Sequence, residues 1–216
     1  MRKDFLNCWQ LMSKWLFRLA FIFVAITLQG CNVSPPSNPG NLCDIFYEKD
    51  DWYDDAADAS EEWGTSIPVL MAIMHQESRF QQKAKPPRKK IFGFIPGPRP
   101  SDSYGYSQAK KSTWQWYMTA SGNYGADRDD FEDAVDFIGW YSKVSYQRCS
   151  IKRNDAYHLY LAYHEGHGGF NRRTFKNKAW LRQVAKKVSS QSYRYASQLK
   201  GCEKNLQRSG WFFGLF

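Results

Sequence analysis

One glutamate closes the most apolar run of the chain, in which IPVLMAIM at 67–74 is followed by HQESRF at 75–80. The helical positions i, i+3, i+4 and i+7 of this run form one stripe, made of Leu70, Ile73, Met74 and Glu77. We therefore predict that Glu77 points inward, near the C-terminal end of a helix. Apolar surroundings and the negative end of the helix dipole both raise the pKa of a carboxyl group. A glutamate that stays protonated near neutral pH could act as a general acid; the alternative is a surface ion pair with Arg79 or a distant lysine.

The rest of the chain reads as one helix after another, with no convincing alternating strand. Gly64 is expected to end the helix before the one that carries Glu77. Thr65 or Ser66 then caps the new helix, with Pro68 in its first turn, where proline is tolerated. We expect the fold class to be all-α, a single compact domain with a long basic, Pro- and Gly-rich loop at 81–103. The predicted helices lie at 43–63, 65–77, 109–120, 130–148, 154–165 and 178–200.

The first thirty residues have the features of a secretory signal. Basic residues precede the apolar stretch LAFIFVAITL at 19–28, which is too short to span a bilayer as a helix. LQGC at 28–31 resembles the lipobox of bacterial lipoproteins, which implies cleavage after Gly30 and a lipid anchor on Cys31. An ordinary signal peptide with a chance cysteine is the alternative. Asn32, in place of aspartate, implies delivery to the outer membrane, with the domain facing the periplasm.

We divide the chain into a signal peptide (1–30), a flexible lipidated tether (31–42), one helical domain (43–202) and a C-terminal tail (203–216). Cys43, Cys149 and Cys202 remain once Cys8 leaves with the signal and Cys31 carries the lipid. An oxidising compartment allows one pair and leaves one thiol over. We favour a Cys43–Cys202 disulfide, because Cys43 begins the first predicted helix and Cys202 follows the end of the last one. Sequence alone does not fix the connectivity.

The charge of the chain favours an anionic polymer as partner. The whole chain carries a formal net charge of +9. Without residues 1–30 it has 26 basic and 20 acidic residues, a net charge of +6. A secreted chain of this charge points to cell-wall material, and no recognisable nucleic-acid-binding motif supports the other choice.

Two further short motifs follow the one at Glu77. Residues 105–108 read GYSQ and residues 162–166 read AYHEG. Together with ESRF they resemble, in order, the three signatures of the family 1 lytic transglycosylases, a lysozyme-like helical domain: Glu-Ser-x-Phe, Gly-Leu-Met-Gln and Ala-Tyr-Asn-Ala-Gly. The resemblance covers about residues 45–200. It departs from the family where Tyr106 and Ser107 replace Leu and Met, and where His164 and Glu165 replace Asn and Ala.

The resemblance implies one catalytic residue, Glu77, acting as both acid and base. It would protonate the oxygen that links N-acetylmuramic acid to N-acetylglucosamine in peptidoglycan glycan strands. As a carboxylate it would then take the proton of the muramic acid C6 hydroxyl, which closes on the anomeric carbon to give a 1,6-anhydro end. The resemblance further implies that Ser78, Tyr106 and Gln108 bind substrate and that the hydroxyl of Tyr163 holds the glutamate. No cofactor is implied.

Two other functions remain open. A hydrolytic muramidase would use the same acid, but water would attack the anomeric carbon. A non-catalytic wall-binding lipoprotein would use the fold only to hold the glycan. An envelope-assembly partner is conceivable but not identified by the sequence. The role of the six basic residues of the 81–103 loop is also open. They either bind anionic groups of the cell wall or are simply solvated. We expect the apolar part of this loop, Ile91, Phe92, Phe94 and Ile95, to pack down as a flap over the groove.

HEGH at 164–167 is not a zinc-protease motif. Its second histidine comes one residue too early for HExxH, and Gly166 interrupts the helix. His158 could join His164 and His167 on a metal, but no further ligand cluster is apparent. We therefore predict no metal site.

Overall fold

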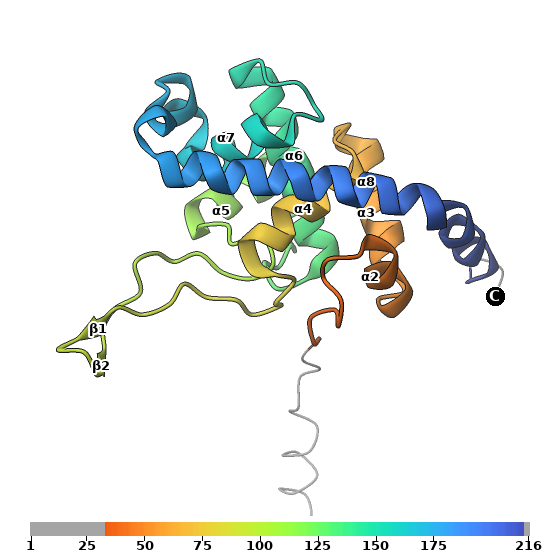
Figure 1. The fold of residues 1–216 in the computed structure, drawn as a ribbon, viewed down its shortest axis with the longest axis horizontal. Helices are drawn as coiled ribbons and strands as arrows, with labels where there is room; N and C mark the ends of the chain where they lie inside the picture. The colour runs from red at the N-terminus through yellow and green to blue at the C-terminus, as the bar shows by residue number, and fades with distance from the viewer. Residues whose placement is uncertain (1–32, 214–216) are drawn as a thin grey trace, which may run out of the picture. The chain divides into compact units, whose positions relative to one another are not determined.

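The structure, a computed structural model, describes residues 33–213, with side chains as far as residue 207. The predicted signal peptide (1–30) and the predicted lipidation site Cys31 lie outside the described residues. Helices dominate the fold, and the all-α prediction is confirmed. The elements, in chain order (Figure 1), are α2 (Leu42–Glu48), α3 (Trp52–Trp63), α4 (Ile67–Ser78), β1 (Lys90–Ile91), β2 (Ile95–Pro96), α5 (Lys111–Ser121), α6 (Phe131–Cys149), α7 (Ala156–Asn171), the 3-10 helix η1 (Thr174–Asn177) and α8 (Ala179–Phe213).

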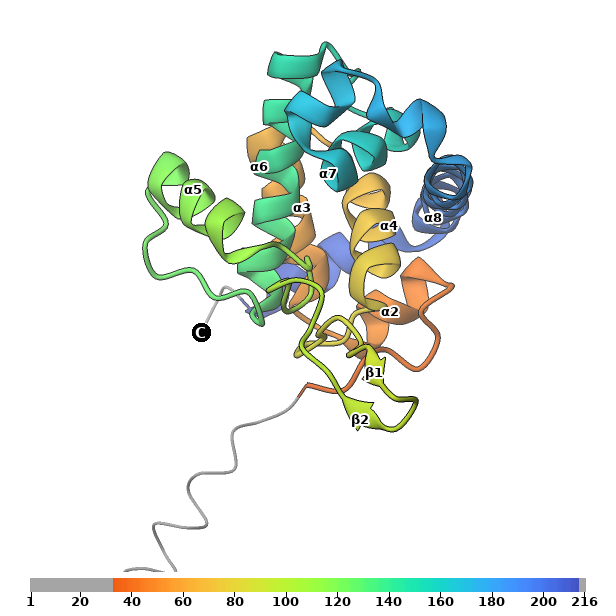
Figure 2. The ribbon, with the colours of Figure 1, turned by 90° about the vertical axis from the view of Figure 1, so that its left-hand side faces the viewer.

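α4 is the central helix of the domain. It packs against α3, α6, α7 and α8, and every residue from Ile67 to Met74 is buried. A helix that is apolar on all sides belongs inside a protein, and this explains the central place of α4. Figure 2 shows α4 with α8 on one side of it, α3 and α6 on the other, and α7 above it. Among the described residues, no helix is both long and apolar enough to cross a bilayer.

The helix ends follow local sequence signals in several places. Gly64 ends α3 with a left-handed φ of 73°, and Pro68 lies in the first turn of α4. The Asp155 carboxylate caps α7 by accepting a hydrogen bond from the amide of His158 at 3.1 Å. The predicted helix at 43–63 is in fact two helices, because the chain leaves the helical conformation at Lys49 (φ −122°, ψ 89°).

Both segments that flank the predicted domain make contacts with it. The Ser37 amide donates to the Glu48 carboxylate at 2.7 Å, so the tract predicted as a flexible tether already contacts the domain there. At the other end, α8 continues past residue 200, where the prediction stopped, with Cys202 and Leu206 buried in the core. Residues 203–213 are therefore a continuation of the last helix and not a separate tail.

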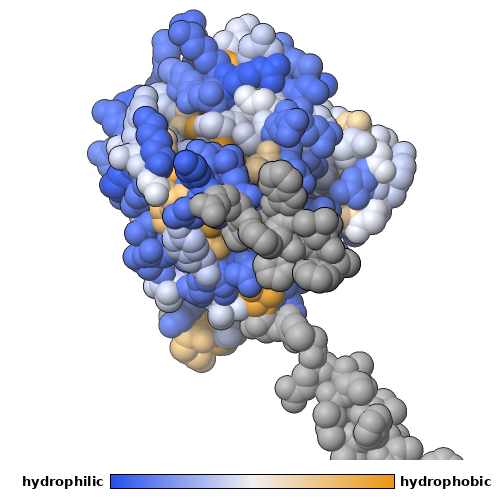
Figure 3. Space-filling model, turned by 90° about the vertical axis from the view of Figure 1, so that its right-hand side faces the viewer, coloured by the Kyte–Doolittle hydropathy of each residue, from blue (hydrophilic) through white to orange (hydrophobic). Residues whose placement is uncertain are grey.

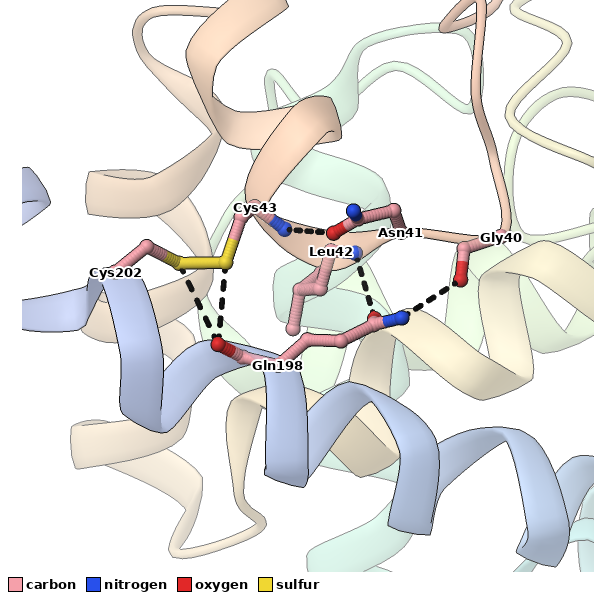
Figure 4. The surroundings of a disulfide bond; sticks show 6 residues. All are labelled: Gly40, Asn41, Leu42, Cys43, Gln198 and Cys202. Carbon is pink, nitrogen blue, oxygen red and sulfur yellow. Dashed lines mark hydrogen bonds between the residues drawn. A yellow bond between two sulfur atoms is a disulfide. The ribbon is translucent and has the colours of Figure 1, made fainter.

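A disulfide joins the two ends of the domain, as predicted. Cys43 in α2 and Cys202 in α8 are bonded, with their Cα atoms 6.1 Å apart (Figure 4). The side chain of Gln198 reinforces the same junction, because it accepts from the Leu42 amide at 2.9 Å and donates to the Gly40 carbonyl at 3.3 Å. Cys149 remains a free thiol.

The 81–103 loop differs from the prediction in two ways. It contains a short antiparallel hairpin in which Lys90 pairs with Pro96 and Ile91 with Ile95, although we expected no regular element there. The hairpin also projects away from the helices instead of packing down as a flap (Figures 1 and 2). The flap prediction is wrong, since Phe92 and Phe94 are 84% and 75% exposed.

Candidate active site

Glu77 lies in the last turn of α4, as the apolar stripe predicts. Glu77 as a whole residue is partly exposed. Its carboxyl group, however, is surrounded by protein atoms closely enough to lose much of its hydration. Burial raises the pKa of Glu77 to about 7, and a hydrogen bond with the Tyr160 hydroxyl opposes that rise. The side chain is therefore largely protonated just below neutral pH and can become a carboxylate without a large change in free energy.

The chain turns sharply directly after Glu77. Arg79 and Phe80 both have left-handed backbones, with φ of 52° and 61°, which is uncommon for residues other than glycine. The Ser78 hydroxyl accepts from the Phe80 amide at 3.1 Å and donates to the Met74 carbonyl at 3.3 Å. Phe80 is fully buried, so its ring anchors the turn. Ser78 is thus a buried turn-forming residue, and its hydroxyl is already committed to the backbone.

α7 supplies two tyrosines beside Glu77. The hydroxyl that hydrogen-bonds the carboxyl group belongs to Tyr160, not to Tyr163 as the resemblance implied. Tyr163 donates instead to the carbonyl of Ser107 at 2.7 Å, although it lies near enough for the charge of Glu77 to raise its pKa, after burial as the main cause. Tyr160 lies three residues before Tyr163, and residues three apart in a helix share one face. The sequence therefore did contain a signal that Tyr160 lies beside the same site.

The GYSQ motif forms a tight turn beside this pair. Gly105 has a φ of 74°, and a Cβ atom there would lie 1.8 Å from the Arg128 carbonyl oxygen, so only glycine fits. The Gln108 side-chain amide donates to the carbonyls of Ala84 and Gly105, each at 2.9 Å. Gln108 therefore fastens the base of the 81–103 loop to the motif.

Tyr106 does not lie where a substrate-binding residue must lie. It is 1% exposed, and its ring packs edge-on against Trp52 and Phe131 at centroid distances of 5.7 and 5.8 Å. The expectation that it contacts a glycan needs correction, because in this structure it belongs to the core.

The second acid of the AYHEG motif has a structural role. The Glu165 side chain is 3% exposed and forms an ion pair with Lys178 at 2.7 Å. Burial alone would raise the pKa of Glu165, but hydrogen bonds from Lys178, Thr174 and His164 outweigh it and hold the pKa at about 2. Glu165 is therefore ionised at neutral pH, and it ties α7 to the segment before α8 instead of serving as a proton donor.

The histidines near this motif make separate contacts. His167 stacks on Tyr141 at 4.4 Å and its Nε2 lies 2.9 Å from the Ser145 hydroxyl, while burial lowers its pKa to about 4. His158 pairs with Asp155, and His164 with its neighbour Glu165. Each ring thus has a partner of its own in the protein.

The hollow of about 540 Å³ between α4 and α8 is a different place from the one at Glu77. Glu77 is not part of its lining, and the lining residues His75, Gln76 and Arg79 stand on the far side of α4. The site is therefore defined by the contacts of Glu77 with α7 and the GYSQ turn.

The comparisons with known proteins agree with this geometry. A family model described as Transglycosylase SLT domain matches residues 19–202, most of the chain. Neither the curated proteins nor the solved structures gave a match. With the three motifs assembled on an all-α scaffold, the chain belongs to the transglycosylase SLT domain family and carries a lysozyme-like lytic transglycosylase domain.

Proposed function

We propose that the protein cleaves the N-acetylmuramic acid–N-acetylglucosamine bond of peptidoglycan and leaves 1,6-anhydromuramic acid ends. The observation that carries the proposal is the carboxyl of Glu77, with a pKa near 7, in a domain of a family that acts in peptidoglycan turnover. A general acid works best when its pKa lies close to the working pH.

The proposed reaction uses Glu77 twice. The protonated carboxyl gives its proton to the glycosidic oxygen as the bond to the anomeric carbon breaks. The resulting carboxylate, which the Tyr160 hydroxyl stabilises by hydrogen bonding, then accepts the proton of the C6 hydroxyl while that oxygen bonds to the anomeric carbon. No water enters the product, and Glu77 ends protonated for the next cycle.

The proposal includes the placement of the enzyme. A lipid on Cys31 would hold the domain at the outer membrane, facing the periplasm and the wall. The lipobox-like LQGC and the apolar stretch before it support this part.

Product analysis of digested sacculi tests the reaction. The wild-type chain should release muropeptides with anhydro ends. Glu77→Gln, which keeps the side-chain shape but has no acidic proton, should lower release by roughly 10²–10⁴-fold without changing the helical content. Reducing ends in place of anhydro ends would identify a muramidase. Unchanged release by the variant would remove Glu77 from the reaction, and no release by the folded wild type would favour a wall-binding role.

A further inference from the structure

The hairpin of the 81–103 loop presents apolar side chains to solvent at the end of an arm. Phe92 and Phe94 are 84% and 75% exposed, and Ile91 and Ile95 are each 44% exposed. Single exposed apolar residues are ordinary, but four within five positions at a projecting tip are not. The surface that Figure 3 shows, on the side away from the arm, is dominated by hydrophilic residues. The tip is thus an apolar feature that the rest of the domain does not cover.

The tip has a defined shape. Backbone pairing of Ile91 with Ile95 closes a three-residue turn, and the amide of Gly97 donates to the Lys89 carbonyl at 2.7 Å below it. Phe92 and Gly93 have φ of 53° and 80°, so the chain reverses between the two phenylalanines. The two rings therefore flank one turn and form the outermost part of the arm.

The stem of the arm, residues 81–90 and 96–101 on either side of the tip, carries only positive charge. Between Glu77 and Asp102 the sequence has no acidic residue. Among the side chains that the structure describes, residues 33–207, no ion pair includes a basic residue of the stem. The exposed basic residues of the stem are Lys83, Lys85, Arg88, Lys89, Lys90 and Arg99.

This order of groups matches the layers of a lipid surface. Aromatic and aliphatic side chains partition into the boundary between headgroups and acyl chains, and lysine or arginine just above them meets lipid phosphates. A protein partner fits less well, because two rings on a five-residue tip offer far less than the roughly 800 Å² that each side of a stable interface buries. Sugar chains offer neither an apolar phase for the rings nor a dense layer of phosphates.

We propose that the hairpin docks on a membrane that contains anionic phospholipids, with Phe92 and Phe94 inserted below the phosphates and the basic stem against them. In both Figure 1 and Figure 2 the hairpin and the segment that leads into α2 lie on the same, lower side of the helical unit. A lipid on Cys31 would be only two residues before Val33, so one membrane can receive both contacts. The hairpin then fixes the orientation of an otherwise singly tethered domain.

Amide hydrogen exchange of the full-length chain on vesicles tests the docking. It reports on the hairpin residues themselves, so membrane binding through the N-terminal segment does not obscure the result. Two vesicle types are compared: phosphatidylcholine alone, and phosphatidylcholine mixed with phosphatidylglycerol. We expect the amides of residues 88–98 to exchange several-fold more slowly in the second, and high salt to reduce the protection. The double variant Phe92→Ser, Phe94→Ser should lose the protection, since each ring contributes roughly tenfold to partitioning.

The control is Tyr124→Ser, which removes an aromatic ring that is 70% exposed elsewhere on the domain. It should keep the protection of the hairpin. Both variants should melt like the wild type, and both should cut soluble, uncrosslinked glycan strands at the wild-type rate, so this test is separate from that of the enzyme activity. Equal exchange in the two vesicle types, or protection by sacculus fragments instead of by lipid, would overturn the proposal.

Discussion

Two opposing influences set the acidity of Glu77. Burial in the last turn of α4 disfavours the carboxylate, and the Tyr160 hydroxyl stabilises it. The net result, a pKa of about 7, lets one side chain donate a proton and take one back at similar free energy. A single carboxyl group can therefore perform both steps of the proposed reaction.

Replacing Tyr160 with phenylalanine should change the pH profile in a defined direction. Activity that needs protonated Glu77 is present below its pKa and is lost as the pH rises through it. Without the hydroxyl the carboxylate loses a donor, so the pKa of Glu77 rises and the alkaline limb of the profile moves to higher pH. The rate of muropeptide release, measured across the pH range, gives the position of the alkaline limb.

Tyr163→Phe is the matched control, because it removes a hydroxyl one turn later that donates to the Ser107 carbonyl. Its alkaline limb should stay in place. If Tyr163→Phe moves the limb and Tyr160→Phe does not, the assignment of the carboxyl's partner is wrong.

Single residues were predictable from the sequence only where a strong pattern constrained them. The inward direction of Glu77 follows from the helical stripe, and so does the raised pKa of its carboxyl group. Ser78, Gln108 and Tyr163 are all close to the site, but their polar atoms bind backbone groups. Tyr106 was misplaced because the direction of its ring depends on the turn at Gly105, which a motif of four letters does not describe.

Among the elements, the start of α4 was predictable because Thr65, Ser66 and Pro68 mark it. The length of α8 was not predicted. Tyr195, Leu199, Cys202 and Leu206 continue one buried stripe along it, and Gly201 stands on the exposed side. The hairpin at 90–96 was also missed, since its pairing involves only two residues in each strand and lies within a Pro-rich segment.

Gly139 sets the distance between α3 and α6. A Cβ atom at this position would lie 2.6 Å from the Trp63 ring, and the indole Nε1 is held by a hydrogen bond to the Asp136 carboxylate. Gly139→Ala should therefore lower the free energy of unfolding by about 1–3 kcal/mol, measured by urea denaturation.

The same substitution at Gly201 provides the contrast, since no atom lies within 4 Å of its added Cβ. Gly201→Ala should raise the free energy of unfolding by roughly 0.5–1 kcal/mol, because alanine favours the helical backbone. Equal effects at both positions would mean that the contact with Trp63 does not limit the packing.

At the scale of the whole molecule, the disulfide joins the beginning of the domain to its last helix. Its cysteines are 159 positions apart, so it restricts most of the unfolded chain. Replacing both Cys43 and Cys202 with serine should lower the free energy of unfolding by roughly 2–5 kcal/mol. Thermal or urea unfolding with and without a reductant measures this difference.

Cys149→Ser serves as the control, because that thiol is free. It should keep the sensitivity to reductant, whereas the double variant should lose it. A wild-type chain whose unfolding is the same in both conditions would show that the bond contributes nothing to stability.

The pKa of Glu77 decides whether this side chain can donate a proton at neutral pH. Carbon-13 NMR of glutamate side chains, titrated in the wild type and in Glu77→Gln, identifies the Glu77 carboxyl as the signal that the variant lacks. We predict a midpoint near 7, against an ordinary value of 4.5. A midpoint at the ordinary value would mean that Glu77 is already a carboxylate at neutral pH, and it would contradict its role as the proton donor.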